Sequence, residues 1–207
     1  MLLNNKEPQK KSVLAVGPHP DDVELGCFGT LARLASEGFT INILLLSKGS
    51  LKEGQRIEEA RESAEIIKAN FFVEDLEDGN ILDNYKTVDI IRKYIDMIKP
   101  GILFSPPLKD GHQDHKNVAQ AIIAAIKDVK EVYFYETPKS FDFSPRLYVD
   151  ISNFIELKLK AMLFHKSQIK NEEIIREAII SASKYHGFKI NQSGKHFEAF
   201  DVFRVIF

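Results

Sequence analysis

Two short segments of the chain concentrate side chains that can bind a metal ion or move a proton. The first is GPHPDD, residues 17–22, and the second is DGHQDH, residues 110–115. Together they hold three of the six histidines of the chain and four aspartates. Imidazole and carboxylate groups are the usual protein ligands of zinc and of related divalent metals. The two segments therefore predict a divalent-metal site.

The first segment has a backbone suited to aiming ligands. His19 precedes Pro20, and a residue before proline is kept out of the helical region. Such an extended loop can direct an imidazole and a nearby carboxylate at one point. One imidazole, one carboxylate and a second imidazole make three ligands and leave a position for water, as catalytic zinc sites do. A neighbouring carboxylate is then free to accept the proton of that water.

The elements that would position these segments follow from the spacing of the apolar residues. Short apolar runs predict strands at 13–16, 41–46, 71–76, 102–104, 131–135, 146–151 and 200–207. Apolar residues at helical spacing predict helices at 25–36, 55–69, 88–98, 117–126, 154–168 and 172–186, and Gly38 is expected to end the first of them. Strands that alternate with helices indicate βαβ units. We therefore expect a three-layer α/β/α, Rossmann-like, doubly wound sheet that is mostly parallel.

Both polar segments follow predicted strands, 13–16 and 102–104. Sheets of this kind bind ligands at the carboxyl ends of their strands. Each segment alone has a simpler explanation, since HPDD is compatible with a turn and DGHQDH with a helix start that Asp114 caps. Their joint position after two strands of one sheet favours the metal site over two coincidences.

Composition sets the broad class of the protein. The 207 residues fit one domain over 1–207, in which the polar residues 1–11 are expected to form a flexible N-terminal tail. A net charge of −2 does not favour electrostatic binding to nucleic acid or to anionic lipid. Cys27 is the one cysteine, so no internal disulfide is expected. Because we also find no secretory signal and no apolar run of membrane-spanning length, the cytoplasm is the expected location.

The two segments resemble the PIG-L/LmbE-like family of metal-dependent N-deacetylases. The resemblance begins with VGPHPDDVELGCFGTLARLASEG and continues with DGHQDH. Weaker support comes from Arg56 with Glu59-Ala60, from Lys160-Ala161 followed by HKSQ at 165–168, and from FEAF at 197–200. The similarity spans nearly the whole chain, from about Val13 to Phe207.

The resemblance implies a reaction, a cofactor and a ligand set. The reaction is removal of an N-acetyl group from an amino sugar or an N-acetylglucosaminyl conjugate. The cofactor is a zinc ion, with ferrous iron as the other possibility. His19, Asp22 and His115 occupy the positions of the metal ligands, and Asp21 occupies that of the general base for the water that the metal activates.

The resemblance also implies roles for neighbouring residues. His112 occupies the position of the histidine that steadies the oxyanion or serves as acid, and Asp114 is expected to orient a neighbouring imidazole. Two positions depart from the family. Gln113 stands where proline is common and Phe28 where glycine is common. Neither is a proposed ligand, so these departures bear on substrate fit rather than on the chemistry.

Other marked residues have competing explanations. Arg56 is a candidate substrate contact or a solvated charge on a helix face, and Asp78 is a candidate contact to a sugar hydroxyl or part of an Asp-Gly turn. Cys27 is expected in the core rather than as a nucleophile. His165 is expected to pack or to contact another subunit rather than to bind metal. The sequence leaves open whether the protein forms a homo-oligomer.

The same residues bear on three alternative functions. A nucleotide-binding protein of this fold needs a glycine-rich loop after its first strand, whereas Pro18 and Pro20 remove amide donors there. A non-catalytic carbohydrate-binding or scaffold protein has no need of Asp21. A metal-dependent amidohydrolase that acts on a non-sugar N-acyl substrate stays open. The expected partner is a small-molecule N-acetylated sugar conjugate.

Overall fold

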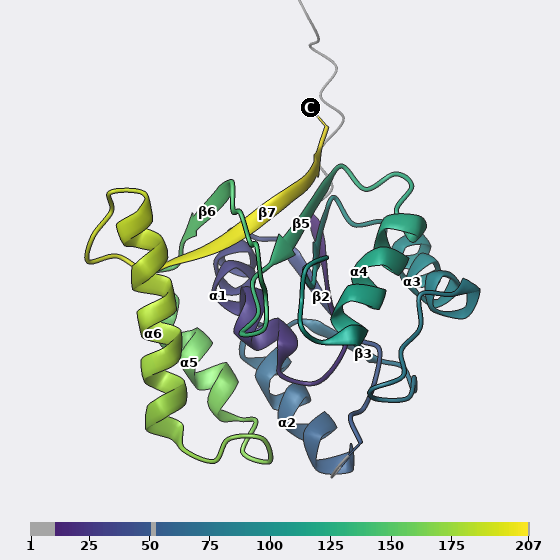
Figure 1. The fold of residues 1–207 in the computed structure, drawn as a ribbon, viewed down its shortest axis with the longest axis horizontal. Helices are drawn as coiled ribbons and strands as arrows, with labels where there is room; N and C mark the ends of the chain where they lie inside the picture. Colours follow the sequence, from purple (N-terminus) through teal and green to yellow (C-terminus); the bar gives the residue numbers. More distant parts are fainter. Residues whose placement is uncertain (1–10, 51–52, 207) are drawn as a thin grey trace, which may run out of the picture.

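The computed structural model describes residues 11–50 and 53–206, and these residues fold around one twisted sheet (Figure 1). The strands are β1 (Ser12–Gly17), β2 (Thr40–Leu45), β3 (Asn70–Val73), β4 (Ile102–Ser105), β5 (Glu131–Tyr135), β6 (Leu147–Asp150) and β7 (Phe197–Val205). The helices are α1 (Asp22–Ser36), α2 (Glu53–Ile66), α3 (Tyr85–Ile98), α4 (Gln113–Ala125), α5 (Ile155–Leu163) and α6 (Glu172–Lys189). All of the predicted strands and helices are present; β5 has the predicted bounds, and the others differ at one or both ends. Of the predicted tail at 1–11, only Lys11 lies inside the described residues.

The strand order is β3-β2-β1-β4-β5-β7-β6. The first five strands in this order pair in parallel, and β7 runs antiparallel to both β5 and β6. The chain moves outward from β1 to β3 and then returns to place β4 on the other side of β1. The predicted doubly wound, mostly parallel sheet is therefore confirmed. Its topological switch point lies between β1 and β4, where such sheets form a ligand-binding crevice.

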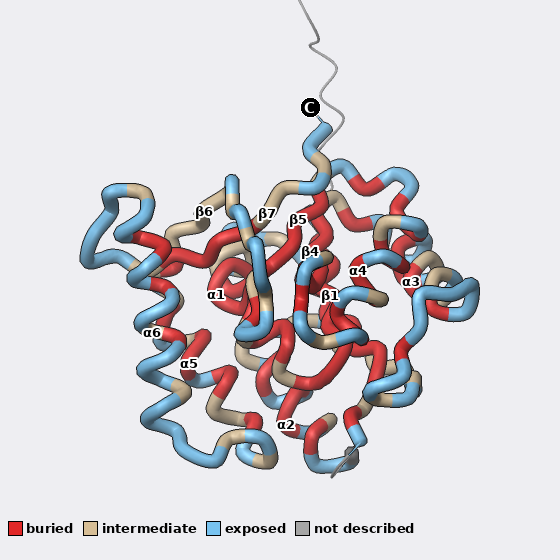
Figure 2. Tube along the Cα trace, viewed as in Figure 1, coloured by how far each residue is buried: buried red, intermediate tan, exposed pale blue. Residues whose placement is uncertain are grey.

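The sheet is covered by helices on both faces, which makes three layers (Figure 1). Along β1, Leu14 and Val16 pack with residues of α3 and α4, whereas Val13 and Ala15 pack with residues of α1 and α2. This alternation follows from the two-residue period of a strand, and both faces are apolar because both are buried. Figure 2 shows the buried chain gathered in the strands and the outer turns of α6 exposed.

Local capping contacts set the helix ends. The predicted stop after α1 is confirmed, because Gly38 takes a φ of 85° and the Phe39 N–H donates to the Leu34 carbonyl. The helix predicted at 117–126 begins earlier, at Gln113, because the His112 side chain caps it by accepting the Asp114 N–H. The simpler explanation of DGHQDH, a helix start that Asp114 caps, therefore holds for the helix start and is wrong for the capping residue.

A buried ion pair ties the C-terminal part of the chain to α1. Lys158 on α5 pairs with Glu198 on β7 at 2.5 Å and donates to the Leu25 carbonyl at 2.6 Å. Glu198 also accepts the N–H groups of Gly29 and Thr30. Glu198 of the FEAF stretch therefore fixes α1, whose first residue, Asp22, is the last residue of the first polar segment. Across the described part of the chain, no helix is both long and apolar enough to span a bilayer.

Candidate metal centre

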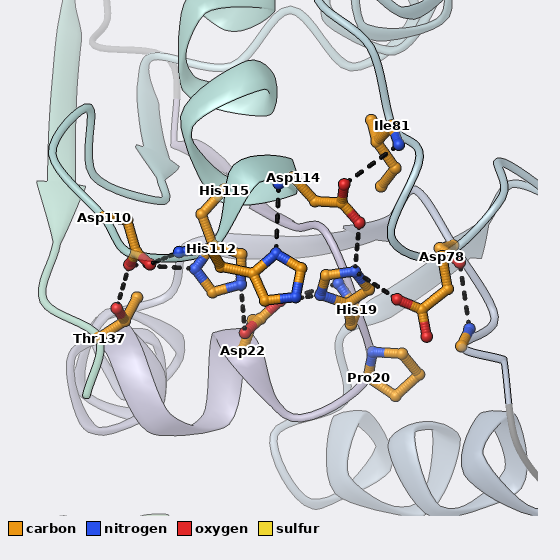
Figure 3. Close-up of polar contacts among 12 residues, drawn as sticks. His19, Pro20, Asp22, Asp78, Ile81, Asp110, His112, Asp114, His115 and Thr137 are labelled. Carbon is orange, nitrogen blue, oxygen red and sulfur yellow. Dashed lines mark hydrogen bonds and ion pairs between the residues drawn. The ribbon is translucent and has the colours of Figure 1, made fainter. Parts of the chain in front are cut away.

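The two polar segments meet at the switch point, after β1 and after β4. His19, Asp22 and His115 are buried, and one ligand atom of each lies within 4.8 Å of the others. Asp22 stands between the two rings, with Oδ2 at 3.2 Å from His19 Nδ1 and Oδ1 at 3.2 Å from His115 Nε2 (Figure 3). The structure thus brings together the three side chains that the sequence analysis gave as candidate metal ligands.

The far nitrogen of each of these two rings contacts a further carboxylate. His19 Nε2 lies 2.9 Å from Asp114 Oδ2, and His115 Nδ1 lies 3.2 Å from Asp110 Oδ2. A carboxylate in this position fixes the tautomer and the angle of a metal-binding imidazole. Asp114 was expected to orient an imidazole and lies where that role requires. Asp110 was not given a role, although it opens the same segment, five residues before His115.

The two orienting carboxylates are themselves held in place. Asp114 accepts the N–H groups of Gly79 at 2.7 Å and Ile81 at 3.2 Å. Asp110 accepts the His112 N–H at 2.7 Å and the Thr137 hydroxyl. Both side chains are fully buried. The imidazoles are therefore aimed by groups that have little freedom to move.

His19, His112 and Asp114 form a second group with ligand spacing. In that group Asp114 already takes two backbone N–H groups and the His19 ring, and His112 Nδ1 accepts the Asp114 N–H at 3.2 Å. These contacts use both oxygens of Asp114 and one of the two ring nitrogens of His112. The set of His19, Asp22 and His115 keeps its donor atoms directed at one another and is the better candidate.

The electrostatics of the cluster favour positive charge at its centre. Burial opposes the charged form of His19, but the hydrogen bonds that its ring donates to Asp114 and Asp22 outweigh this effect and raise the pKa of His19 to about 10. Burial also opposes a charged His115, yet Asp22 and Asp110 raise its pKa. Burial disfavours the Asp22 carboxylate, and contacts with the two rings still hold its pKa well below its usual range. A divalent cation meets the same demand for positive charge, so this donor set fits a metal.

Asp21 lies beside the cluster in an unusual backbone conformation. Its φ of 96° is left-handed, and its side chain makes no capping hydrogen bond although it precedes α1. Non-glycine residues in this region are uncommon and often sit at functional sites. Burial, followed by repulsion from Asp22, raises the pKa of Asp21 to about 7, against the opposing charges of His165 and Arg56. A carboxyl group with a pKa near neutrality is suited to general base catalysis.

His112 stacks on one ligand ring and lies close to the other. Its ring centroid is 4.8 Å from that of His115 and 4.9 Å from that of His19. Burial and the two neighbouring imidazoles lower the pKa of His112. With Nδ1 accepting the Asp114 N–H, a neutral ring carries its proton on Nε2 and can donate from there.

Arg56 and Asp78 both contact the first segment. Arg56 donates to the Pro20 carbonyl at 3.1 Å and lies 3.9 Å from Asp78. Asp78 Oδ1 is 3.1 Å from His19 Nε2, and Oδ2 accepts the Ser50 N–H. The predicted Asp-Gly turn is present, with Gly79 at a φ of 78°. Arg56 is buried, so it is not a solvated charge on a helix face.

The Gln113 departure has a structural counterpart. Its side-chain amide donates to the Gly79 carbonyl, and Asn117 one turn later donates to the Ile81 carbonyl at 2.8 Å. Proline at 113 could make no such contact. Gln113 therefore joins the start of α4 to the 78–81 loop, which contacts His19 and Asp114. Phe28, the other departure, is fully buried in α1.

Two further expectations concern residues outside the cluster. Cys27 is fully buried, and burial raises the pKa of its thiol, so it belongs to the core. His165 is also fully buried, 3.3 Å from Glu24. It packs between helices rather than joining the candidate ligands.

Known proteins resemble this chain in sequence and in fold. The family model "PIG-L: GlcNAc-PI de-N-acetylase" matches residues 14–126, which include both polar segments. An uncharacterized deacetylase of Escherichia coli, YaiS, is 32% identical over 77% of this chain and 92% of its own length. The diacetylchitobiose deacetylase of Thermococcus kodakarensis is 28% identical over 86% of this chain and 78% of its own length.

A solved structure shows the same fold. The N,N'-diacetylchitobiose deacetylase from Pyrococcus horikoshii superposes with a TM-score of 0.82 and is 22% identical. The match covers 93% of this chain and 84% of that one. At this identity the likeness concerns the fold alone.

Proposed function

This chain belongs to the PIG-L family of deacetylases, and on that premise we propose that it is a divalent-metal hydrolase that removes an N-acetyl group from an amino sugar conjugate. The observation that carries the proposal is the convergence of His19, Asp22 and His115, each imidazole backed by its own carboxylate. The sugar substrate is supported by the name of the Thermococcus relative. An N-acyl substrate that is not a sugar remains the alternative.

His19, Asp22 and His115 would hold the cation, most simply zinc, with ferrous iron as the other candidate. When bound, the cation would polarise the amide carbonyl and lower the pKa of water at its open position. Asp114 and Asp110 would keep the two imidazoles in the tautomer that presents a lone pair to it.

Asp21 would act as the base. The two carboxylate oxygens of its neighbour Asp22 contact the two imidazoles, whereas the Asp21 side chain makes no capping hydrogen bond. The ionised carboxylate would accept a proton from the attacking water as the new carbon–oxygen bond forms. It would return that proton to the leaving amine as the carbon–nitrogen bond breaks, so Asp21 ends the cycle as it began.

His112 would bind the oxyanion. The neutral ring can donate through Nε2 because Nδ1 is held by the Asp114 N–H. Such a contact commonly contributes roughly 3 kcal/mol to the transition state. Arg56 and Asp78 would contact substrate hydroxyls or, through Pro20 and His19, hold the loop that the substrate meets.

The test is acetate release by metal-loaded protein from N-acetylglucosamine, its nucleotide-linked, inositol-linked and β-linked conjugates, and N-acetylated amino acids. We expect release from at least one sugar and none after chelation. The matched control is the Asp21→Asn variant, which keeps the ligands and loses the base. Release from the amino acids alone would replace the sugar proposal with the alternative.

A further inference from the structure

Helix α6 presents large apolar side chains on the side that faces away from the core. Its buried side includes Ile179 and Ser183. On the opposite side Ile174 is 61% exposed, Tyr185 56% and Phe188 66%. Figure 1 shows α6 at the outer margin of the molecule, and Figure 2 shows its outer turns exposed. The proposed reaction gives none of these exposed residues a role.

The exposed side chains form one continuous stripe along the helix. They follow one another at alternating intervals of four and three residues, and they are Ile174, Ala178, Ser181, Tyr185 and Phe188. This spacing keeps side chains on one helix face, and it is the spacing at which helices pair along their length. Because the two middle residues of the stripe are small, the backbone of a second helix can approach closely there. The stripe therefore fits another helix with an apolar face.

The charges beside the stripe indicate which helix that is. Glu177 and Lys184 are exposed and seven residues apart, so they lie on the same flank of the stripe, about 10 Å apart along the axis. Within the described part of the chain, neither takes part in an ion pair. Glu173, one turn before Glu177, adds a second negative charge to that flank. The flank is thus acidic towards the start of α6 and basic towards its end.

An antiparallel second copy of α6 matches both the stripe and the flank. A two-fold axis beside Ser181 places the two Ser181 side chains opposite each other and Ile174 opposite the partner subunit's Phe188. The same axis places Glu177 beside the partner subunit's Lys184. Such a contact is isologous, so each of these pairs forms twice.

A parallel pair of the same helices does not match. In a parallel pair, the flank that carries Glu177 and Lys184 meets the opposite flank of the partner. Lys184 would then face the partner subunit's Lys189, and Glu177 would face the partner subunit's Ala182. The charge pattern therefore selects the antiparallel arrangement.

We propose that α6 is a homodimer interface at which two copies of this chain pack antiparallel through the stripe from Ile174 to Phe188. The inference is independent of the proposed reaction, because it uses no residue of the metal cluster. One helix from each chain makes a small interface. The dimer should therefore dissociate in the micromolar range.

The first test is sedimentation equilibrium of the full chain over a range of concentrations. Wild type should approach twice the chain mass of 23.6 kDa, and Tyr185→Glu, which places a charge in the stripe, should stay monomeric. Wild type that is monomeric even at about 100 μM would overturn the proposal. A dimer that survives Tyr185→Glu would also overturn it, since the copies would then associate through another face.

A charge swap separates the proposed pairing from misfolding. Lys184→Glu turns two symmetric attractions into repulsions and should weaken the dimer roughly tenfold. Glu177→Lys should have a similar effect, and both substitutions in one chain should restore the wild-type dissociation constant. The matched control is Arg176→Glu, which makes the same charge change on α6 but away from the stripe, and should leave that constant unchanged. A double variant that is no better than the single ones would contradict the pairing.

Disulfide crosslinking tests the direction of the helices. Cys27, the native cysteine, is fully buried, so thiols introduced on α6 can be oxidised selectively. With oxidised glutathione, chains carrying Ile174→Cys should link to chains carrying Phe188→Cys when the two are mixed, and neither variant should link to itself. Linkage within each variant alone would show a parallel pair and overturn the antiparallel dimer, as would no linkage at all.

Discussion

Asp110 offers the sharpest test of how the metal cluster is built. Its Oδ2 accepts from His115 Nδ1 and from the Thr137 hydroxyl, and its Oδ1 accepts the His112 N–H at 2.7 Å. An Asp110→Asn variant keeps the shape but has one acceptor oxygen and one NH₂ group. In either orientation of the amide, its NH₂ group faces another hydrogen-bond donor. Either His112 loses its acceptor, or His115 must move its proton to Nε2, the atom that faces Asp22.

The second outcome removes the lone pair that would bind the cation. Loss of an orienting partner usually costs roughly 10–100-fold in metal affinity or activity, which corresponds to about 1.4–2.8 kcal/mol. We expect a loss in this range, with the fold retained, because the substituted atoms are of equal size.

The assay is a zinc titration against a competing chelator of known affinity. Asp142→Asn is the matched control, because Asp142 is exposed and pairs only loosely with Lys109 at 3.5 Å. Its zinc affinity should equal that of the wild type. Equal zinc affinity in Asp110→Asn would refute the claim that this carboxylate orients His115.

Four further predictions concern the same cluster. His19→Ala should reduce bound metal from one ion per chain to a small fraction, and metal analysis that finds full occupancy would exclude His19 as a ligand. Asp21→Asn should bind metal normally and lose roughly 10²–10⁴-fold in kcat, so normal turnover would remove Asp21 as the base. Because Asp21 must be ionised to accept a proton and has a pKa of about 7, kcat/KM should rise with pH up to about 7, and a bound cation can only shift this rise to lower pH. Above that pH, the kcat/KM profiles of wild type and His112→Gln should be alike, since His112 is already neutral. A fall in kcat/KM at high pH that is present in wild type and lost in His112→Gln would show that a protonated His112 is needed. Gln113→Pro should free the 78–81 loop and raise KM several-fold with little change in kcat or metal content, and unchanged steady-state kinetics would show that the contact with Gly79 is dispensable.

The sequence predicted most of the fold because the relevant signals are local. Apolar periodicity and punctuation by glycine and proline are encoded within a few residues, and they placed every strand and helix. The ends were less well predicted. The helix at 113–125 was expected from 117 because its buried apolar face begins at Val118, whereas its true start depends on a side-chain contact from His112. The spacing of apolar residues does not indicate such a side-chain cap.

The order of the strands also had a sequence basis. Repeated strand–helix units with right-handed crossovers limit the possible sheets, and both polar segments followed strands. Their position at a shared edge could therefore be expected. That β1 and β4 are adjacent, with the reversal of order between them, was decided by how the whole chain packs.

By itself, the sequence determined which chemical groups are available and on which loops: two imidazoles and a carboxylate for a cation, with a second carboxylate beside them. Only the tertiary structure decided which carboxylate orients which imidazole. The Asp114 side chain contacts His19, 95 positions away, rather than an imidazole of its own segment. Asp110 contacts His115. The physical reason is that hydrogen-bond pairing depends on distances of a few tenths of an ångström. Those distances are set by sheet register, by the left-handed turn at Asp21 and by the packing of α1 against α5 and β7, none of which is written in the spacing of residues along the chain.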